Sequence, residues 1–408
     1  MTVYKSNILF CLFVFFFSVK GYEAQAAEDF TRFLENFYPR AAREGITRQT
    51  WDKAFAGVEE PDRRVLEKAA YQPEFTLKIW SYLDARVNSA TAAKGREYAE
   101  KYRTTLQAIS AKFGVRPSIL LALWSMESSY GEALQKTERF HYVPLALATL
   151  AYADPKRKKF GSSQLIAALK ILQAGDVRAD RFLGSWAGAM GHTQFIPTSY
   201  LAYGVDMNGD GRRDIWHSVA DALATAANLL RKNGWRTGKT WGYEVIVPQK
   251  KRALEGQEKT LRQWQALGVY RPDGKAYAWP DDRAVLKFFA GPQGPAFLVM
   301  KNFYIIKRYN NSDFYALAVG LLADEIAGYG SKTLQWPRPQ GSLTFDEILE
   351  MQRLLKQAGF YTGEVDGQPG PRSRQAILLF QRSLGLEETG EATVPVLISL
   401  RQQRGRAE

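Results

Sequence analysis

The stretch LLALWSMESSYG, residues 120–131, combines a strongly apolar helical pattern with a carboxylate near its end. Pro117 suits the first turn of a helix, and Gly131 suits a left-handed cap that ends it. Glu127 therefore falls near the last turn of a helix that otherwise has the composition of a buried core. Because burying an unpaired carboxylate is costly, such a group is solvated, paired or used in chemistry.

Two features of this position oppose the ionisation of Glu127. The negative end of the helix dipole and the apolar neighbours both favour the neutral acid, so the pattern predicts a raised pKa. A raised pKa suits a general acid that works at neutral pH. The alternative is a solvated glutamate at a helix end, and the helix taken alone favours that alternative.

A second stretch, GSWAGAMGHTQFIPTSY at residues 184–200, is rich in glycine and other small residues. Small residues would allow a ligand to approach the backbone closely. Gln194, Thr198, Ser199 and Tyr200 add hydrogen-bonding groups and an aromatic ring. The alternative is a tightly packed loop in which the glycines serve only turns.

The segment DMNGDGRRD, residues 206–214, has the spacing of an EF-hand loop. Its side-chain and backbone oxygens predict a calcium site formed by Asp206, Asn208, Asp210, the Arg212 carbonyl and Asp214. The twelfth position is His217, where an EF-hand requires a bidentate glutamate, and Asp221 is the candidate that closes the shell. The alternative is a loop of Asx turns that binds no metal.

Residues 1–26 have the pattern of a cleaved export signal. Lys5 precedes an apolar run at residues 8–19 that is short for a membrane span, and AQA at residues 24–26 resembles a signal-peptidase site. An uncleaved anchor and a lipoprotein are the alternatives, but Cys11 lies inside the apolar run. Cleavage would remove the only cysteine, so a mature periplasmic protein would need no disulfide.

The net charge of the 408-residue chain is +13, which is typical of proteins that bind acidic polymers or membrane surfaces. Export argues against nucleic acid as the partner and leaves an acidic polymer of the cell envelope. A solvated basic surface without a partner is the alternative. The length is sufficient for two or three domains with separate cores.

The pattern along the chain predicts an α+β protein that is mainly α. Helical patterns cover residues 28–112, 117–235 and 313–330. The segments YEVIVP, AVLKFFA and AFLVMKNFYIIKRY predict a small sheet within a β-rich part at about residues 240–305. Two prolines and a glycine make residues 336–342 a candidate linker between residues 27–335 and a separate domain at residues 343–408.

Taken together, these stretches resemble the lytic murein transglycosylases of the B type, which cleave the glycan strands of peptidoglycan. The resemblance covers most of residues 30–335. Besides the stretches quoted above, its motifs are KTERFHYVPLALATLAY (136–152), VDMNGDGRRDIW (205–216), NLLRKNGW (228–235) and NFYIIKRYNNSDFYALAV (302–319). It implies a core like goose-type lysozyme, with helical and β-rich parts around it.

The resemblance also implies roles for individual residues. The glutamate of the ES-x-YG motif is the catalytic acid and base, which assigns this role to Glu127. The residues expected to line the saccharide cleft are Ser185, Gln194, Tyr309 and Tyr315, with Tyr82 as a further candidate. The metal loop is expected to hold calcium, and no organic cofactor is expected. Leu229 departs from the family, which often has a tyrosine there, so that wall of the cleft is expected to be less polar.

The last 66 residues resemble a second family, the three-helix peptidoglycan-binding domain. Its pattern appears in MQRLLKQAGFY (351–361), VDGQPGPRSR (365–374) and FQRSLGL (380–386). The alternative is a helical accessory that only stabilises the protein. Both resemblances imply peptidoglycan as the partner, and association with other cell-wall enzymes is a further expectation. We expect a monomer.

Hydrolysis of a glycosidic bond usually requires two carboxylates. The candidates for a second carboxylate are Glu132, Asp176 and Asp180, but none belongs to a motif that would place it across a cleft. A single carboxylate fits the family's route, in which the sugar's own 6-hydroxyl closes a 1,6-anhydro ring at the MurNAc–GlcNAc β-1,4 bond. The alternatives are a hydrolytic muramidase with an unidentified second carboxylate, and a non-catalytic scaffold that binds peptidoglycan.

Overall fold

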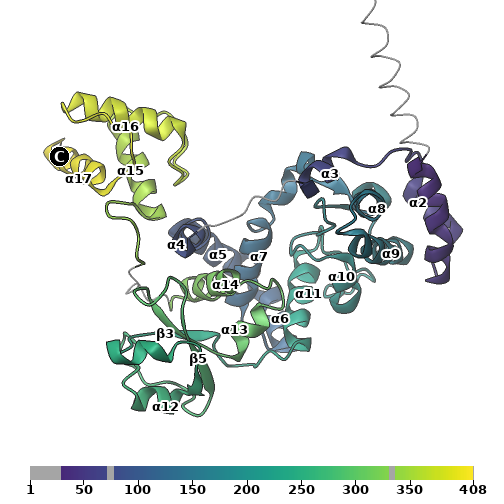
Figure 1. Cartoon of the computed structure of the whole chain (residues 1–408), viewed down its shortest axis with the longest axis horizontal. Coiled ribbons are helices and arrows are strands. Elements are labelled where there is room, and N and C mark those ends of the chain that lie inside the picture. The colour runs from purple at the N-terminus through teal and green to yellow at the C-terminus, as the bar shows by residue number, and fades with distance from the viewer. Residues whose placement is uncertain (1–28, 71–77, 330–335, 408) are drawn as a thin grey trace, which may run out of the picture. The chain divides into compact units, whose positions relative to one another are not determined.

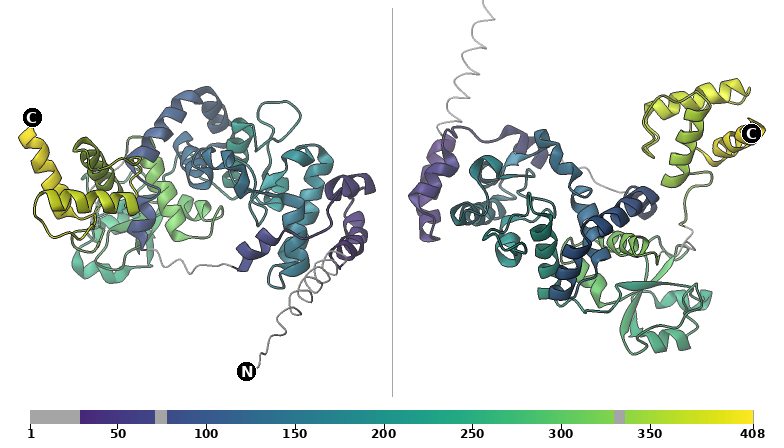
Figure 2. Two further views of the ribbon diagram at one scale, coloured as in Figure 1. Left: turned by 90° about the horizontal axis from the view of Figure 1, so that it is seen from above. Right: turned by 180° about the vertical axis from the view of Figure 1, so that it is seen from behind.

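The structure is a computed structural model that describes residues 29–70, 78–329 and 336–407 (Figures 1 and 2). The chain folds into two compact units, of which the first contains the described residues up to 70 together with residues 127–229, and the second contains the rest. The proposed export signal lies outside the described residues. Among the described residues, no helix combines the length and hydropathy needed to cross a membrane.

The first unit is almost entirely helical. A helix over residues 29–43 begins it, and two short strands pair with each other. Its further elements are α2 (Arg48–Phe55), α3 (Arg63–Ala70), β1 (His141–Tyr142), α8 (Val143–Ala153), α9 (Lys158–Ala174), β2 (Leu183–Gly184), α10 (Pro197–Tyr203) and most of α11 (Val219–Lys232). Short 3-10 turns lie at Glu132–Gln135, Thr137–Arg139 and Ala179–Arg181.

Helices α8 and α9 form the centre of this unit and lie side by side (Figure 1). A Cβ atom on Gly161 of α9 would lie 2.6 Å from the backbone nitrogen of Ala151 in α8, so only glycine permits this close approach. Helix α10 joins them through the side chain of Gln164, which accepts a hydrogen bond from the Thr198 backbone N–H at 3.0 Å. This helical core supports the loops that carry the candidate site.

The second unit contains two helical groups and a sheet. Its first helices are α4 (Ile79–Asp84), α5 (Ser89–Lys101), α6 (Arg103–Phe113) and most of α7 (Pro117–Ser128), followed later in the chain by α12 (Leu261–Ala266), α13 (Lys301–Ile306) and α14 (Asp313–Ile326). The buried ring of Trp124 on α7 packs against Tyr98 and Tyr102, with ring centroids 5.0 and 5.8 Å away. This aromatic contact anchors the apolar part of α7.

The sheet has four antiparallel strands in the order β3-β6-β5-β4. Its strands are β3 (Gly242–Val245), β4 (Glu258–Thr260), β5 (Arg283–Phe288) and β6 (Ala296–Val299), and a 3-10 turn lies at Gln249–Leu254. Trp264 and Leu286 are fully buried in the core beneath it. The predicted α+β class, mainly α with a small sheet, is confirmed.

One part of the strand prediction is wrong. The segment at residues 296–309 forms strand β6 only as far as Val299, and helix α13 begins at Lys301. Residues 302, 303, 305 and 306 are buried, which is the spacing of a helix face and not of a strand. The Asn302 side chain donates hydrogen bonds to the carbonyls of Arg236 and Lys239, at 3.0 and 2.9 Å. These bonds hold the start of the helix in place.

The C-terminal part contains three helices, α15 (Phe345–Gln357), α16 (Pro371–Ser383) and α17 (Val394–Ala407), drawn in yellow-green to yellow in Figure 1. Leu355, Ile377 and Leu397, one from each helix, meet in its core. The fully buried Gln352 accepts the backbone N–H groups of Asp366 and Gly367 at 3.0 and 2.8 Å. One side chain of α15 therefore fixes the turn that VDGQPG predicts.

Candidate active site

Helix α7 ends three residues before the Gly131 cap that the sequence predicts, and an unusual turn follows it. Residues 119–124 are buried, Glu127 is half-buried in the last turn, and the helix stops at Ser128. Ser129, Tyr130 and Gly131 then follow with φ of 51°, 59° and 88°. Two consecutive non-glycine residues in the left-handed region are strained, by about 1–3 kcal/mol each, and such strain is typical of functional sites.

Ser128 holds this turn in place. Its side chain is almost completely buried, and its hydroxyl donates a hydrogen bond of 2.6 Å to the His192 carbonyl. The same oxygen accepts the Gly131 backbone N–H at 3.0 Å. Ser128 thus links the residue after Glu127 to a loop 64 positions later in the chain. This role was not predicted from the sequence, although a serine adjacent to the candidate acid is a visible signal.

The glycine-rich loop is in turn fixed to the end of the predicted metal loop. The His192 backbone N–H donates to the Ile215 carbonyl at 2.9 Å. Gly191 has φ of 66°, and a Cβ atom there would lie 2.3 Å from the Ile215 carbonyl oxygen. The side chain of Gln194, which itself has φ of 50°, donates to the Gly191 carbonyl at 2.8 Å. The glycines therefore serve close packing, and the loop is rigid.

Ser185 lies in a tight turn directly after β2. Its backbone N–H donates to the Ala189 carbonyl at 2.8 Å, and its hydroxyl accepts the N–H groups of Ala187 and Ala189 at 3.3 and 3.0 Å. A hydroxyl that accepts two N–H groups has its proton directed away from them. The half-buried Ser185 side chain can therefore donate one oriented hydrogen bond.

The three tyrosines expected in the cleft belong to the second unit. The rings of Tyr309 and Tyr315 are stacked, with centroids 6.4 Å apart and planes 15° apart. Tyr82 packs against Phe314, with centroids 6.0 Å apart, and the Arg86 guanidinium lies 4.0 Å above the Tyr82 ring. Asp313, which forms ion pairs with Lys287 and Lys307 at 2.6 Å, directly precedes Phe314 and Tyr315 at the start of α14.

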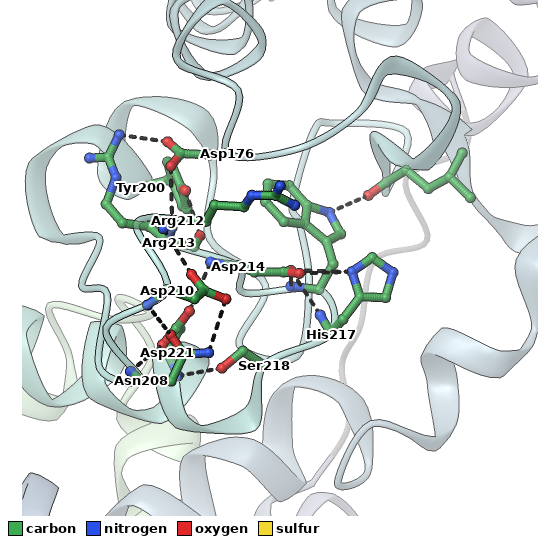
Figure 3. A network of polar contacts seen from close by, with 12 residues as sticks. Asp176, Tyr200, Asn208, Asp210, Arg212, Arg213, Asp214, His217, Ser218 and Asp221 are labelled. Carbon is green, nitrogen blue, oxygen red and sulfur yellow. Dashed lines mark hydrogen bonds and ion pairs between the residues drawn. The ribbon is translucent and has the colours of Figure 1, made fainter.

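The predicted metal loop folds around its own side chains (Figure 3). The two carboxylate oxygens of Asp206 accept the N–H groups of Gly209 and Gly211 at 2.7 and 2.9 Å. Asp210 accepts the Arg212 N–H at 2.9 Å, and Asn208 accepts the Asp210 N–H at 3.2 Å. Side-chain oxygens at alternate positions therefore accept backbone N–H groups of the same loop, as in the Asx turns of the alternative prediction.

Asp221 and Asp214 close this loop. Asp221 is fully buried and accepts the N–H groups of Met207 and Asp214 at 2.8 and 3.0 Å, which joins the two ends of the loop (Figure 3). Burial raises the pKa of the Asp221 carboxyl, against the effect of these N–H bonds. Asp214 accepts the N–H groups of Trp216 and His217, each at 2.9 Å.

The donor set of the loop fits a hard cation such as calcium, because it offers carboxylate, amide and carbonyl oxygens. Within the described ranges, no group of three or more His, Cys, Asp or Glu side chains has a geometry that could hold a metal ion. An EF-hand also uses an asparagine and a backbone carbonyl, which in this chain are Asn208 and Arg212. The loop thus has the ligand types of a calcium site, and its side-chain oxygens accept hydrogen bonds within the loop.

The three candidates for a second carboxylate are otherwise engaged or exposed. Asp176 is buried and forms an ion pair of 2.6 Å with Arg213. Asp180 binds Arg178 through both of its oxygens, and this hydrogen bonding lowers the pKa of Asp180. Glu132 is exposed in a 3-10 turn. Burial lowers the pKa of His192 to about 4, so this residue is neutral at neutral pH.

Comparison with known families agrees with this arrangement. The family described as Transglycosylase SLT domain matches residues 29–324, and a peptidoglycan binding domain family matches residues 345–398. The first match covers well over half of the chain. The chain therefore belongs to the transglycosylase SLT family and carries a C-terminal peptidoglycan-binding domain, which confirms both resemblances.

Individual relatives are lytic transglycosylases. Membrane-bound lytic murein transglycosylase B from Escherichia coli (strain K12) is 32% identical over 240 residues, which are 57% of this chain and 63% of that protein. The chain thus matches less than two thirds of that relative's length. SltB3 from Pseudomonas aeruginosa, solved in complex with NAG-anhNAM-pentapeptide, is 42% identical with a TM-score of 0.72 and coverage of 91% of this chain and 99% of that chain.

A further relative bears on the metal loop. The Escherichia coli lytic transglycosylase Slt35, solved in complex with calcium, is 25% identical. The two structures superpose with a TM-score of 0.60 over 73% of this chain and 92% of that chain.

Proposed function

We propose that the protein is a lytic transglycosylase that cleaves the MurNAc–GlcNAc β-1,4 bond of peptidoglycan without water. In this reaction Glu127 protonates the glycosidic oxygen as the bond to the muramyl C1 breaks. The resulting carboxylate then takes the proton of the muramyl 6-hydroxyl, whose oxygen bonds to C1 and closes a 1,6-anhydro ring. The glutamate ends the cycle protonated, so no net proton is transferred to solvent.

The observation that carries this proposal is that the three candidates for a second carboxylate, Glu132, Asp176 and Asp180, are occupied elsewhere or exposed. A retaining or inverting hydrolase requires a second carboxylate opposite the acid. Asp176 and Asp180 are each bound to an arginine, and Glu132 is exposed. In the proposed route an intramolecular hydroxyl takes the place of that second carboxylate and has the entropic advantage of a tethered reactant. The NAG-anhNAM-pentapeptide complex of the relative SltB3 agrees with such a product.

The other residues expected in the cleft have supporting roles in this proposal. Ser185 donates its hydrogen bond to Glu127 or to the muramyl face of the substrate, and Gln194 lines the same part of the cleft. Tyr82, Tyr309 and Tyr315 provide aromatic surface for sugar rings. The strained turn after Ser128 holds the acid in one orientation, which is the preorganisation that proton transfer requires.

The identity of the product tests the proposal. Digestion of purified cell wall in water labelled with oxygen-18 is expected to yield muropeptides that end in 1,6-anhydromuramic acid, without label and resistant to borohydride reduction. These ends are one water lighter than the reducing ends made by a muramidase, and mass spectrometry distinguishes the two. Label in most of the newly formed chain ends would refute the transglycosylase assignment, and no cleavage at all would favour a scaffold.

We also propose that calcium binds the loop through Asp206, Asn208, Asp210 and the Arg212 carbonyl, with Asp214 and Asp221 completing the site. The calcium complex of the relative Slt35 supports this assignment. Bound calcium would neutralise the negative charge of a loop that is rich in carboxylates and would thereby stabilise its fold. His217 in place of a bidentate glutamate is expected to make the affinity lower than in a complete EF-hand.

Calcium is expected to raise the melting temperature of protein previously freed of metal. A ligand that binds only the native state stabilises it by about 2.7 kcal/mol at a hundredfold excess over Kd. Asp210→Ala should abolish the shift, whereas Asp281→Ala, an exposed aspartate of the second unit, should retain it. The measurement is a thermal unfolding curve with calcium and with chelator. Identical curves for the unmodified protein would exclude the site.

We further propose that residues 1–26 direct export to the periplasm and that residues 343–408 hold the enzyme on the cell wall. The net charge of +13 favours contact with an acidic envelope polymer. A second binding module raises the local concentration of the enzyme on its insoluble substrate.

Deletion of residues 341–408 is therefore expected to weaken co-sedimentation with insoluble wall while sparing the cleavage of short soluble glycans. The truncation removes the C-terminal module completely, because the Gly341 carbonyl already accepts the Val394 N–H at 2.9 Å. Equal sedimentation of the full-length and truncated proteins would contradict the wall-binding role.

A further inference from the structure

A cavity of about 340 Å³ adjoins the turn that carries Glu127. Gly131, which ends this turn, and His192, which binds Ser128, both line the cavity. The 3-10 turns at Glu132–Gln135 and Thr137–Arg139 contribute another side of it, and Arg181 contributes a further side. Every one of these residues belongs to the first unit. The cavity is therefore connected to the candidate acid through a short and rigid piece of backbone.

The lining of this cavity is polar, cationic and in part apolar. Among the described residues that line it, none is an aspartate or a glutamate, and Arg181 contributes a positive charge. Gln135 and Thr137 add hydrogen-bonding side chains, and Leu134, Phe140 and Trp216 add apolar surface. The Trp216 wall is fixed, because its indole N–H donates to the Leu183 carbonyl at 3.0 Å. Such a lining complements an anion with small alkyl groups.

The guanidinium of Arg181 is available for such an anion. The carboxylate beside it is that of Asp180, whose Oδ2 lies 4.0 Å from Arg181 Nε, outside hydrogen-bond range. Asp180 instead gives its two oxygens to Arg178, at 3.0 and 2.8 Å. Arginine forms charge-assisted and often bidentate bonds with carboxylates. The Arg181 guanidinium can therefore bind a carboxylate of a molecule from outside the chain.

The chemistry of the substrate points to one part of it. In a peptide-substituted glycan strand the sugars carry no carboxylate, because the lactyl group is joined to the peptide through an amide. The carboxylates and the small alkyl side chains both lie in the peptide. We infer that this cavity receives the peptide branch of the strand and that Arg181 binds one of the carboxylates of the peptide. This inference rests on the proposed function. The site thus distinguishes peptide-bearing strands from bare glycan.

The experiment compares two substrates with two variants. Wild type, Arg181→Ala and Arg139→Ala are assayed on peptide-bearing glycan strands and on the same strands after their peptide carboxylates have been converted to amides. The peptides are retained, because their removal would free a lactyl carboxylate on each muramyl residue. Arg139 is a matched control, because its side chain is 69% exposed against 67% for Arg181, and each has the carboxylate of the preceding residue at 4.0 Å. Arg139 does not line the cavity among the described residues.

Arg181→Ala is expected to raise KM for the peptide-bearing strand about fivefold with kcat unchanged, which is the range for an exposed charge pair. Its KM for the amidated strand should equal that of wild type, and Arg139→Ala should match wild type on both. An equal effect of Arg181→Ala on the two substrates, or no effect on the unamidated one, overturns the inference. The wild-type product, anhydro or hydrolytic, is read in the same assay, so failure of the proposed function is recognised separately.

Discussion

Glu127→Gln is expected to reduce the turnover of peptidoglycan by about a thousandfold or more, because one residue serves as acid and then as base and general acid–base catalysis contributes about 10²–10⁴. Glutamine keeps the shape of the side chain and removes only the transferable proton. Asp176 and Asp180 are bound by arginines, so neither carboxylate can take over the role. The measurement is the rate of anhydromuropeptide release from purified wall.

Glu132→Gln is the matched control for this experiment. It makes the same change five positions later, in an exposed 3-10 turn that the proposed reaction does not use. This variant should keep nearly all of the activity, and both variants should melt at the wild-type temperature and sediment with wall as before. If Glu127→Gln retained more than a few per cent of the rate, the assignment of the acid would be wrong. A loss in both variants would instead favour the two-carboxylate muramidase.

The second large effect is expected from Gly191→Ala. Alanine at φ of 66° is strained, and its Cβ would lie 2.3 Å from the Ile215 carbonyl oxygen, which belongs to backbone and cannot rotate away. Left-handed strain costs about 1–2 kcal/mol and overpacking of a close contact about 1–3 kcal/mol, so the free energy of unfolding should fall by about 3 kcal/mol. The displaced backbone should also separate His192 from Ile215 and slow catalysis.

Gly175→Ala separates these two causes. Gly175 has φ of 77°, but nothing lies within 4 Å of the place where its Cβ would be. This control carries only the conformational strain, about 1–2 kcal/mol, and should leave activity unchanged. Urea unfolding curves measure both variants, with the slope as a check that the unfolded state is unaltered. Equal destabilisation by the two substitutions would show that the contact with Ile215 has no energetic role.

Much of the site can be read from local sequence pattern. The apolar run from residue 119 to 124, followed by Glu127 and Gly131, specifies a helix with a carboxylate at its end, and α7 follows it closely. The spacing of oxygen side chains in residues 206–214 predicts the turn that the structure contains. These features depend on neighbours a few positions apart, so helix periodicity and turn chemistry are sufficient to predict them.

The same local rules fail where packing decides the outcome. Residues 301–306 have the β-branched and aromatic composition of a strand but form α13, because a helical face fits the space beside α14 and Asn302 finds carbonyl partners there. Propensity is a weak prior that tertiary contacts override. Arg236 and Lys239 are far from Asn302 in the sequence, so a pattern within one short segment cannot predict these hydrogen bonds.

By itself, the sequence determined which residue is the candidate acid, which loop has the residue types of a calcium site and which families the chain resembles. Only the tertiary structure decided that Ser128 is bound to His192 and His192 to Ile215, and that Asp176 and Asp180 are occupied by arginines. It also placed Arg181 at a cavity beside the Glu127 turn. The physical reason is that a helix end is set by the torsion angles and hydrogen bonds of adjacent residues, whereas pairs that are 64 positions apart exist only once the core has packed.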